Sequence, residues 1–485
     1  MVPQGFRGYY YDAEKGRYFK VEHSKTAPSD AAWSSDKVKK RKLEDEAAAA
    51  QVQRLALNKN RITRSDALNA PLMGGFLARE YGQHIRDLRD VGPASFAQGI
   101  IAKGKRDLDR DPEAVNVKHM TVVGTLPGRP FCAVYNKGYE SPTIWSTSLP
   151  RDNNGDLDVR LLRESDCSTT LDCMCTQYEQ TVPQLSDLKY SAKTDLVFVT
   201  SKDPGNRVTR AYALHAFAPK RLGHCDNDIG PTGRYKDARN RKYTSNTVCI
   251  APPTSNHICL VGTDKGVAEF DRTCRLRLCT PLSWRGKPFI PDSFRDVFAI
   301  DFHASNPDIV LFGGRPGKLC VGDLRQEVNQ WDVIQIQNSI AHIKSVSENQ
   351  VLVAGVSNSL SVFDLRYCNL SRVWDRGINM ARRATPIVTM PDYKNGARFD
   401  LGLDYDRGSG IVAAAHDDSK VRLYSVRSGN RLPSRDIDKI YSEVGPIHTL
   451  QFANFDGDKT PSLFVGEKGC INFYSFGVEK LDDEA

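Results

Sequence analysis

The chain has 485 residues, of which 40% are hydrophobic and 26% charged, as is ordinary for a globular protein. No apolar run approaches the roughly 18 residues that a membrane helix needs, and the first residues lack the apolar core of a signal peptide. We therefore expect a protein of the nucleus, and also of the cytoplasm, that does not contact membranes. The net charge of +8 is concentrated at the start, because residues 1–110 carry an excess of about seven basic groups.

The first predicted element is an aromatic hairpin within residues 1–25. Residues 8–21 read GYYYDAEKGRYFKV, in which turn-forming residues separate two aromatic runs that favour strands. The motif consists of Tyr9, Tyr10, Tyr11, Asp12, Tyr18 and Phe19. An isolated hairpin is marginal in water, so we expect this one to pack on another part of the chain or on another protein.

A basic, low-complexity and partly helical linker is predicted for residues 26–72. Its basic run contains Lys39, Lys40, Arg41 and Lys42. Such a run is typical of nuclear import signals or of nucleic-acid contacts. Alternatively, the run is the solvated start of a helix, since residues 43–50 are mostly strong helix formers. We predict nuclear enrichment and consider nucleic acid the less favoured partner.

A helical segment is predicted for residues 73–114. Four apolar residues, spaced to lie on one face of a helix, are Leu77, Tyr81, Ile85 and Leu88. We expect this helix to end at residues 91–93, which read VGP, and residues 96–101 to complete a helical hairpin. The apolar face would dock on a partner or pack beneath this protein's own β domain, and the sequence leaves both alternatives open.

From about residue 115 the chain repeats one pattern of a hydrophobic strand, a tight turn and a second, alternating strand. Residues 350–367, QVLVAGVSNSLSVFDLRY, are a clear copy. Near its end, the second strand has an aromatic or small residue that is followed by a polar one. We use this aromatic or small residue to align the repeats and call it the register mark. Seven register marks are found, at Trp145, Tyr212, Phe270, Gly322, Phe363, Tyr424 and Tyr474.

The repeat predicts an all-β fold. The shortest separation between register marks is about 41 residues, which agrees with the roughly 40 to 45 residues of a four-stranded WD-type blade. Seven units resemble a seven-bladed WD-repeat β-propeller, which we expect to span residues 115–485. Closing a ring of small sheets in this way removes exposed sheet edges. The insertions near residues 216–243, 275–294 and 371–397 are candidate binding loops, because they are long and contain several basic residues.

No catalytic, cofactor or metal site is predicted. The chain has 12 cysteines but no CxxC pair, so we expect most thiols to be buried small hydrophobic groups. Nucleotide-binding, hydrolase and kinase signatures are absent. The sequence His416-Asp417-Asp418 could suggest a metal or acid–base cluster, but it falls where the other repeats have their turn. These observations point to a protein that is not an enzyme.

Two consecutive repeats end in Asp-Leu-Arg, and the key residues are Asp323, Arg325, Asp364 and Arg366. The aspartates are common structural residues of WD blades, whereas a repeated arginine suits recognition of carboxylates or carbonyls on a partner. Aromatic-Asp-x-Arg in adjacent blades resembles the signature of WD-repeat substrate receptors of cullin-4 RING ubiquitin ligases. Gly322 departs from this pattern, because it stands where the aromatic is expected.

The resemblance extends to the N-terminal region. An aromatic motif of the type YYYD-x-E-K-x-RYF, a basic helical stretch and a propeller are together similar to the WD-repeat protein 21 type of these receptors. The resemblance implies a non-catalytic substrate receptor that binds a DDB1-like ligase adaptor and presents protein substrates. It also implies that the adaptor contacts the paired Asp-Leu-Arg ends together with the helix that carries Leu77, Tyr81, Ile85 and Leu88.

A second resemblance concerns only the aromatic motif. YYYD-x-E-x-G-x-Y is also similar to the aromatic repeats of OCRE domains in RNA-processing proteins. Aromatic side chains of that kind bind peptides, and beside a basic tail they could stack on bases. OCRE domains string several such hairpins together, whereas this chain has one. The alternative function is therefore an RNA-processing scaffold with a peptide-binding motif.

Overall fold

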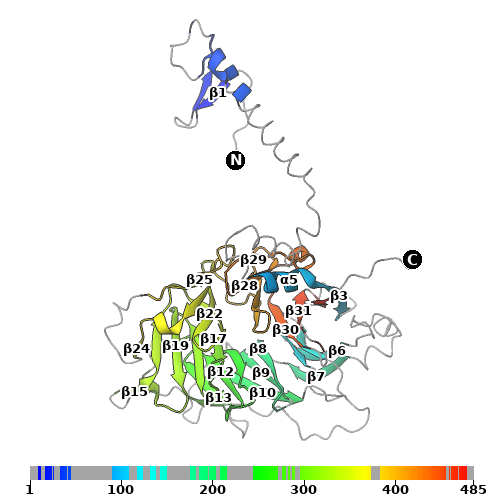
Figure 1. Cartoon of the computed structure of the whole chain (residues 1–485), viewed down its shortest axis with the longest axis vertical. Helices are drawn as coiled ribbons and strands as arrows, with labels where there is room; N and C mark the ends of the chain where they lie inside the picture. Colours follow the sequence, from blue (N-terminus) through cyan, green and yellow to red (C-terminus); the bar gives the residue numbers. More distant parts are fainter. Residues whose placement is uncertain are drawn as a thin grey trace, which may run out of the picture. The chain divides into compact units, whose positions relative to one another are not determined.

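The structure is a computed structural model of the whole chain (Figure 1). It describes residues 9–12, 17–23, 26, 33–40, 42–44, 90–108, 117–123, 132–137, 143–149, 175–181, 185–194, 196–203, 208–215, 244–270, 276–279, 282–284, 287–289, 295–372, 383–454, 458, 460–467 and 469–477. The chain divides into two compact units, Met1–Gly74 and Gly75–Ala485. The described part of the chain is built mainly of strands in small antiparallel sheets, which confirms the predicted all-β class.

The first unit contains the predicted aromatic hairpin. β1 (Tyr9–Asp12) pairs with β2 (Arg17–Lys20), so that Tyr10 lies opposite Phe19. The ring of Phe19 stacks on Trp33, with centroids 4.6 Å apart and planes 11° apart. The hairpin therefore packs on another part of its own chain, which is one of the two alternatives that the sequence left open. Residues 35–40 are helical and include two lysines of the predicted import signal.

The second unit contains seven sheets of three to five strands among its described residues. The first four sheets are β4 (Met120–Val123), β5 (Cys132–Lys137), β6 (Thr143–Ser148) and β7 (Cys175–Thr181); β8 (Leu185–Ser191), β9 (Leu196–Asp203) and β10 (Val208–His215); β11 (Ser245–Ile250), β12 (Cys259–Thr263), β13 (Gly266–Phe270) and β14 (Leu276–Leu278); and β17 (Val297–Phe302), β18 (Ile309–Gly314), β19 (Lys318–Asp323), β20 (Asp332–Gln335) and β24 (Ser371–Arg372). A separate hairpin consists of β15 (Leu282–Trp284) and β16 (Lys287–Phe289).

The other three sheets are β21 (Ile340–Ser345), β22 (Gln350–Gly355), β23 (Ser359–Asp364) and β25 (Val388–Thr389); β26 (Leu403–Asp406), β27 (Ile411–Ala415), β28 (Val421–Ser425) and β29 (Arg431–Leu432); and β30 (Thr449–Ala453), β31 (Ser462–Glu467) and β32 (Cys470–Phe476) joined by β3 (Ile100–Asp107). In every sheet the strands up to the third follow one another in chain order. Each of the seven register marks lies in the third strand of a different sheet, so the predicted repeat matches the observed sheets.

The segment before the repeats differs from the predicted helical hairpin. α5 spans Val91–Gly99, and the chain then continues as β3 rather than as helix. Pro93 is tolerated in the first helical turn, where its missing N–H would have no partner. Ile100 and Ile101 are buried in a strand because β32 offers an antiparallel partner for residues 100–107. The predicted boundary at residue 115 is therefore too late, since β3 belongs to the last sheet.

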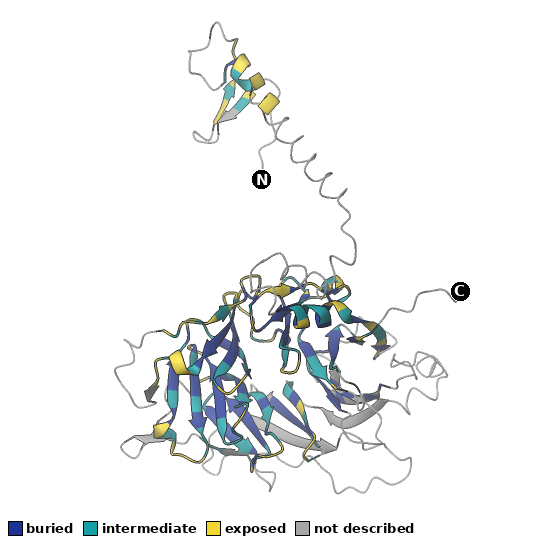
Figure 2. Cartoon of the chain, in the orientation of Figure 1, coloured by how far each residue is buried: buried dark blue, intermediate teal, exposed yellow. Residues whose placement is uncertain are grey.

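The hydrophobic core lies between neighbouring sheets (Figure 2). One cluster joins Tyr135 of β5 with Phe473 of β32, and another joins Phe312 of β18 with Leu260 of β12. α5 contacts β28, β29 and β32, where Phe96 and Ala97 pack into a further cluster (Figure 1). Each sheet thus buries apolar side chains against the next, as stacked layers do in globular domains.

The first strands of successive sheets also contact one another. β4 contacts β8, β8 contacts β11, β11 contacts β17, β17 contacts β21, β26 contacts β30, and β30 contacts β4. β21 and β26 are joined by an ion pair between Lys344 Nζ and Asp404 Oδ1 at 2.7 Å. The contact between β30 and β4 brings the last sheet of the second unit beside the first one, through the first strand of each.

Candidate functional site

The two Asp-Leu-Arg sequences fold into the same kind of turn. Directly after β23, the backbone N–H of Arg366 donates to Asp364 Oδ1 at 3.0 Å. The guanidinium then folds back onto the same carboxylate, with Nε donating to Oδ1 at 3.0 Å and Nη2 to Oδ2 at 2.7 Å. This two-bonded fork is the preferred geometry between arginine and a carboxylate. The aspartate is buried, whereas 59% of the Arg366 side chain is exposed.

Arg325 repeats this arrangement after β19. Its backbone N–H and its Nε donate to Asp323 Oδ1 at 3.0 and 2.9 Å, and its Nη2 donates to Oδ2 at 2.7 Å. Its Nη1 lies 3.7 Å from Asp308 Oδ2. The side chain is 61% exposed. We refer to residues 323–325 and 364–366 together as the arginine turns.

Gly322 is explained by Trp331, a residue of the link between β19 and β20. A Cβ atom on Gly322 would lie 2.6 Å from Cδ2 of the Trp331 ring. The indole is buried, and its Nε1–H donates to the Asp323 carbonyl at 2.9 Å. The aromatic group that the motif expects is therefore supplied by a residue nine positions later in this sheet. The departure at Gly322 leaves the hydrogen bonds of Asp323 and Arg325 the same as in the other turn.

Both carboxylates of the arginine turns are held in the ionised form. The hydrogen bonds from Arg366 lower the pKa of Asp364, and those from Arg325 lower the pKa of Asp323. Each guanidinium has five N–H groups and uses two of them on its own aspartate. Both arginine side chains are more than half exposed, so their remaining N–H groups suit carbonyl or carboxylate acceptors of a partner.

Apolar side chains accompany the second arginine turn. Tyr367 is 77% exposed, and the guanidinium carbon of Arg366 lies 5.6 Å from its ring centroid. Leu370 is also exposed. The arginine turns follow the third strands of two sheets whose first strands, β17 and β21, are in contact. They therefore lie at the same edge of neighbouring sheets and combine charge with aromatic and aliphatic surface.

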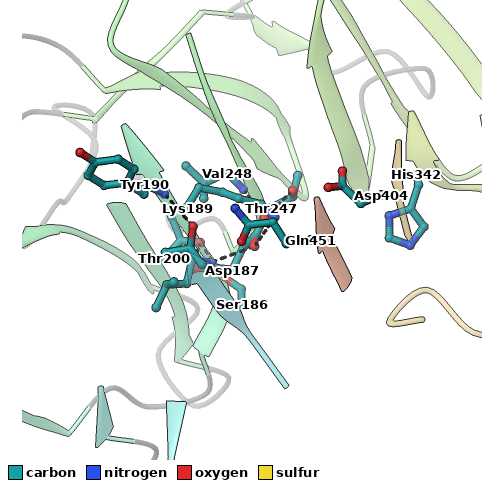
Figure 3. Close-up of polar contacts among 12 residues, drawn as sticks. Ser186, Asp187, Lys189, Tyr190, Thr200, Thr247, Val248, His342, Asp404 and Gln451 are labelled. Carbon is teal, nitrogen blue, oxygen red and sulfur yellow. Dashed lines mark hydrogen bonds and ion pairs between the residues drawn. The ribbon is translucent and has the colours of Figure 1, made fainter. Parts of the chain in front are cut away.

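A cavity of about 570 Å³ is the second candidate site. It is lined by residues of or next to the first strand of every one of the seven sheets. Side chains of these strands accept backbone N–H groups of the neighbouring first strand. One example is Asp187, which accepts from Val248 at 2.9 Å (Figure 3). The others are Thr121 from Tyr190 at 3.2 Å, Asp301 from Ser345 at 2.7 Å, Asp404 from Phe452 at 2.8 Å, and Gln451 from Val122 at 2.8 Å.

The charges around the cavity are mutually compensated. Although burial acts to lower the pKa of Lys344, the carboxylates of Asp404 and Asp301 raise it above its ordinary value. Burial raises the pKa of Asp301, which accepts two backbone N–H groups. Burial lowers the pKa of His342 to about 4, and its neutral ring donates from Nε2 to the Leu401 carbonyl at 2.7 Å. These groups hold the strands together and resemble structural networks more than acid–base pairs.

His416 belongs to a turn, as the sequence suggests. The ring is fully buried; Nδ1 accepts the N–H of Lys394 at 3.1 Å, and Nε2 contacts the Tyr424 hydroxyl at 3.0 Å. Burial and the neighbouring Arg422 lower the pKa of His416 to about 3, so the imidazole is neutral. Asp418 pairs with Arg422 at 2.6 Å. The cluster ties a loop to the turn between β27 and β28.

Several other predictions concern only part of the described chain. Among the described residues, no group of three His, Cys, Asp or Glu side chains could hold a metal ion, and no helix could span a membrane. Of the six cysteines whose side chains the structure describes, three have buried thiols, namely Cys259, Cys320 and Cys470. The Leu77, Tyr81, Ile85 and Leu88 face, Arg41 and the loop at 216–243 lie outside the described residues. The backbone of Tyr11 and Asp12 is described as part of β1.

One cluster that the sequence does not predict is formed by Phe298, Arg315 and Phe399 beside the cavity. Phe298 and Arg315 come from the same sheet, on β17 and in the turn between β18 and β19, whereas Phe399 lies in the loop before β26, so no short sequence motif links the three. Comparison with models of known protein families and with curated protein sequences finds no match to this chain. The functional assignment therefore depends on the residues themselves.

Proposed function

We propose that the seven sheets form a closed, seven-bladed WD-repeat propeller. Three observations support this: the contacts between successive first strands, the cavity that all seven first strands line, and the pairing of β3 with β32. In that pairing, a strand from the start of the unit completes the sheet at its end. A closed ring of this kind needs no covering of exposed edges.

We further propose that the protein is a non-catalytic substrate receptor of a cullin-RING ubiquitin ligase. The observation that carries the proposal is the pair of arginine turns, which repeat the same hydrogen bonds at the same edge of neighbouring sheets. Each aspartate fixes its arginine in advance, so little side-chain freedom is lost on binding. Interfaces concentrate their energy in arginine and aromatic anchors, and Tyr367 adds such an aromatic beside Arg366.

Affinity purification of the full chain from cells tests this function. The cullin-4 adaptor should be enriched with the parent protein and depleted with the double variant Arg325→Ala, Arg366→Ala. An Arg398→Ala variant is a matched control, since that arginine is also partly exposed but lies outside the arginine turns. Absence of the adaptor from the parent purification would remove the ligase interpretation.

The aromatic hairpin supports a second candidate, an RNA-processing scaffold. While Phe19 stacks on Trp33, Tyr9 and Tyr18 are exposed and lie on the other face of the hairpin, because side chains alternate along each strand. Exposed tyrosines of this kind suit peptide binding or stacking on bases. Spliceosomal RNA that copurifies with the chain and disappears on nuclease treatment would favour this candidate over the ligase.

We also propose that the basic run directs the chain to the nucleus. Lys40 is exposed and lies 4.0 Å from Glu44, one helical turn away, which leaves its charge accessible. A fluorescent fusion in which residues 39–42 are all changed to alanine should lose nuclear enrichment. An unchanged distribution would show that the basic run is only the polar surface of a helix.

A further inference from the structure

The cluster of Phe298, Arg315 and Phe399 lies at the sheet edge opposite the arginine turns. Arg315 occupies the turn between β18 and β19, whereas Arg325 follows the other end of β19. The Arg315 guanidinium carbon lies 5.3 Å from the Phe298 ring centroid and 5.0 Å from that of Phe399. We call these three residues the mouth cluster, because both phenylalanines line the 570 Å³ cavity.

Arg315 differs in its partners from Arg325 and Arg366 of the arginine turns. It is exposed, and among the described residues it makes no hydrogen bond or ion pair. Contact with the aromatic faces restrains the planar guanidinium without using its N–H groups. As far as the described residues go, its N–H donors are therefore held in place and available to a ligand.

Phe298 is directed to the cavity by a β-bulge. In β17, Val297 pairs with Gly314 and Ala299 pairs with Gly313, which leaves Phe298 without a partner between them. Bulges of this kind change the direction of a side chain and are frequent beside binding sites. The corresponding bulge residues of β8, β11 and β21 also line the cavity, and these are Ser186, Asn246 and Ala341. Of these four bulge residues only Phe298 is aromatic, so it marks one side of the cavity.

Phe399 is fixed by the loop that precedes β26. His448 contacts the Asp400 carbonyl at 2.8 Å, and His342 donates to the Leu401 carbonyl at 2.7 Å. Earlier in the loop, the buried side chain of Asn395 donates to the Arg398 carbonyl at 2.9 Å. These contacts hold the backbone on both sides of Phe399, so the mouth cluster is formed before any ligand arrives.

In the cavity behind the mouth cluster the lysine and the carboxylates compensate one another, so recognition of an anion falls to Arg315 beside the two phenylalanines. Asp187, Asp301 and Asp404 accept backbone N–H groups of neighbouring strands, and Asp404 also neutralises Lys344. The volume is within the range of about 300–1,000 Å³ that is usual for ligand pockets. It admits individual side chains but no folded domain. The exposed Asp400 next to Phe399 lies 3.8 Å from Arg398 Nη1, so its charge is offset by an arginine other than Arg315.

We propose that the mouth cluster binds an acidic segment of a partner protein through a glutamate or aspartate carboxylate. Arg315 receives the carboxylate with a two-bonded fork, and apolar side chains beside the acidic residue contact Phe298 and Phe399. This site goes beyond the ligase role, because it uses neither of the arginine turns and exists whether or not the adaptor binds.

The test captures peptides on the immobilised full chain. Four libraries of short, N-acetylated and C-amidated peptides have random flanks and a central residue fixed as glutamate, glutamine, lysine or phosphoserine. Blocked ends ensure that terminal carboxylates do not contribute. Glutamate peptides should be enriched roughly tenfold over glutamine peptides, since charge-assisted forks are about twice as strong as neutral hydrogen bonds.

Two variants assign this preference to the mouth cluster. Arg315→Ala should abolish it, and Arg315→Lys should reduce it several-fold, because an ammonium group has no planar fork. The double variant Arg325→Ala, Arg366→Ala should keep it. Equal capture of the glutamate and glutamine libraries would overturn the proposal, as would a glutamate preference that survives Arg315→Ala. Enrichment of phosphoserine peptides alone would overturn the carboxylate assignment.

Discussion

The arginine turns and the mouth cluster use the same type of side chain in opposite ways. Arg325 and Arg366 are each held by the carboxylate two residues earlier, with bonds of 2.7 to 3.0 Å. Arg315 is held by the faces of two phenylalanines and makes no hydrogen bond with the described residues. In the arginine turns, two N–H groups of each guanidinium bind the aspartate of the same turn. Contact with aromatic rings uses none of the N–H groups of Arg315.

This difference suggests how the two edges divide their roles. The arginine turns are local, rigid and repeated, which suits a fixed surface that meets one partner in one orientation. The mouth cluster is assembled from one repeat and a distant loop beside a cavity, which suits recognition of a side chain. Four predictions test this division, and each changes one edge while the other should remain intact.

The largest effect is expected from Trp331→Ala, which removes the base of the Arg325 turn. The buried indole fills the space that Gly322 leaves and packs against Phe312 at a centroid distance of 5.8 Å. Loss of such a ring should lower the free energy of unfolding by about 3–5 kcal/mol. Denaturant titration measures this change. Gly322→Ala, which forces a methyl against the ring, should cost about 1–3 kcal/mol. A loss below about 1 kcal/mol for Trp331→Ala would contradict the assigned role of the indole.

A second prediction separates the edges by pH. The folded pKa of His416, about 3, lies below its ordinary value of 6.5, so the unfolded chain binds the proton more readily and stability falls as the pH drops below 6.5. Between pH 7 and pH 5 this histidine should cost about 2 kcal/mol of unfolding free energy. The carboxylates of Asp323 and Asp364 have lowered pKa values, so the stability they contribute is lost only below about pH 4.

Hydrogen exchange at pH 7 and pH 5 distinguishes the two edges. Protection should decrease around the loop that Lys394 anchors on His416, while the amides of Arg325 and Arg366 keep theirs. His416→Gln should reduce the pH dependence of unfolding. Equal losses of protection at both edges would mean that the histidine does not govern the acid response.

A third prediction compares the two aspartates. Asp364→Asn places an NH₂ group against a guanidinium N–H and removes the charge, and because Asp364 is buried the change should cost about 1–3 kcal/mol. Asp323→Asn should cost less, since that carboxyl is more exposed. Thermal or denaturant unfolding of both variants checks the order. A reversed order would indicate that burial does not set the strength of these turns.

The smallest effect on stability is expected at Arg315. Its side chain is exposed and contributes only its contacts with two rings, so Arg315→Ala should change the free energy of unfolding by about 1 kcal/mol or less. The same denaturant titration measures it. A much larger loss would mean that Arg315 supports the fold, and the mouth cluster would then be structural.

The sequence predicted much of the β unit because its signals are local. A strand, a turn and a second strand fit within about 20 residues, so all seven third strands could be located from the repeat alone. The Asp-x-Arg turns were visible for the same reason, since donor and acceptor are two residues apart. The role of Gly322 was not, because its space is filled by a residue from the next link of the chain.

Features that depend on distant parts of the chain could not be predicted. Ile100 and Ile101 follow directly on a helix and become a strand only because β32, more than 360 residues later, pairs with them. Phe298 and Arg315 of one sheet meet Phe399 of a loop that precedes β26, and no short motif links all three. In both cases contacts between distant parts of the chain determine the structure, because local propensity favours no single conformation or neighbour.

The adaptor affinity of three purified full-length proteins tests the central claim most directly: the parent, the Arg325→Ala, Arg366→Ala double variant, and Arg315→Ala. If the arginine turns are the ligase-docking edge, the double variant should bind the cullin-4 adaptor more than about tenfold more weakly than the parent. Arg315→Ala should bind it as the parent does. A folded double variant with parental affinity, or an equal loss for Arg315→Ala, would contradict the division of roles between the two edges.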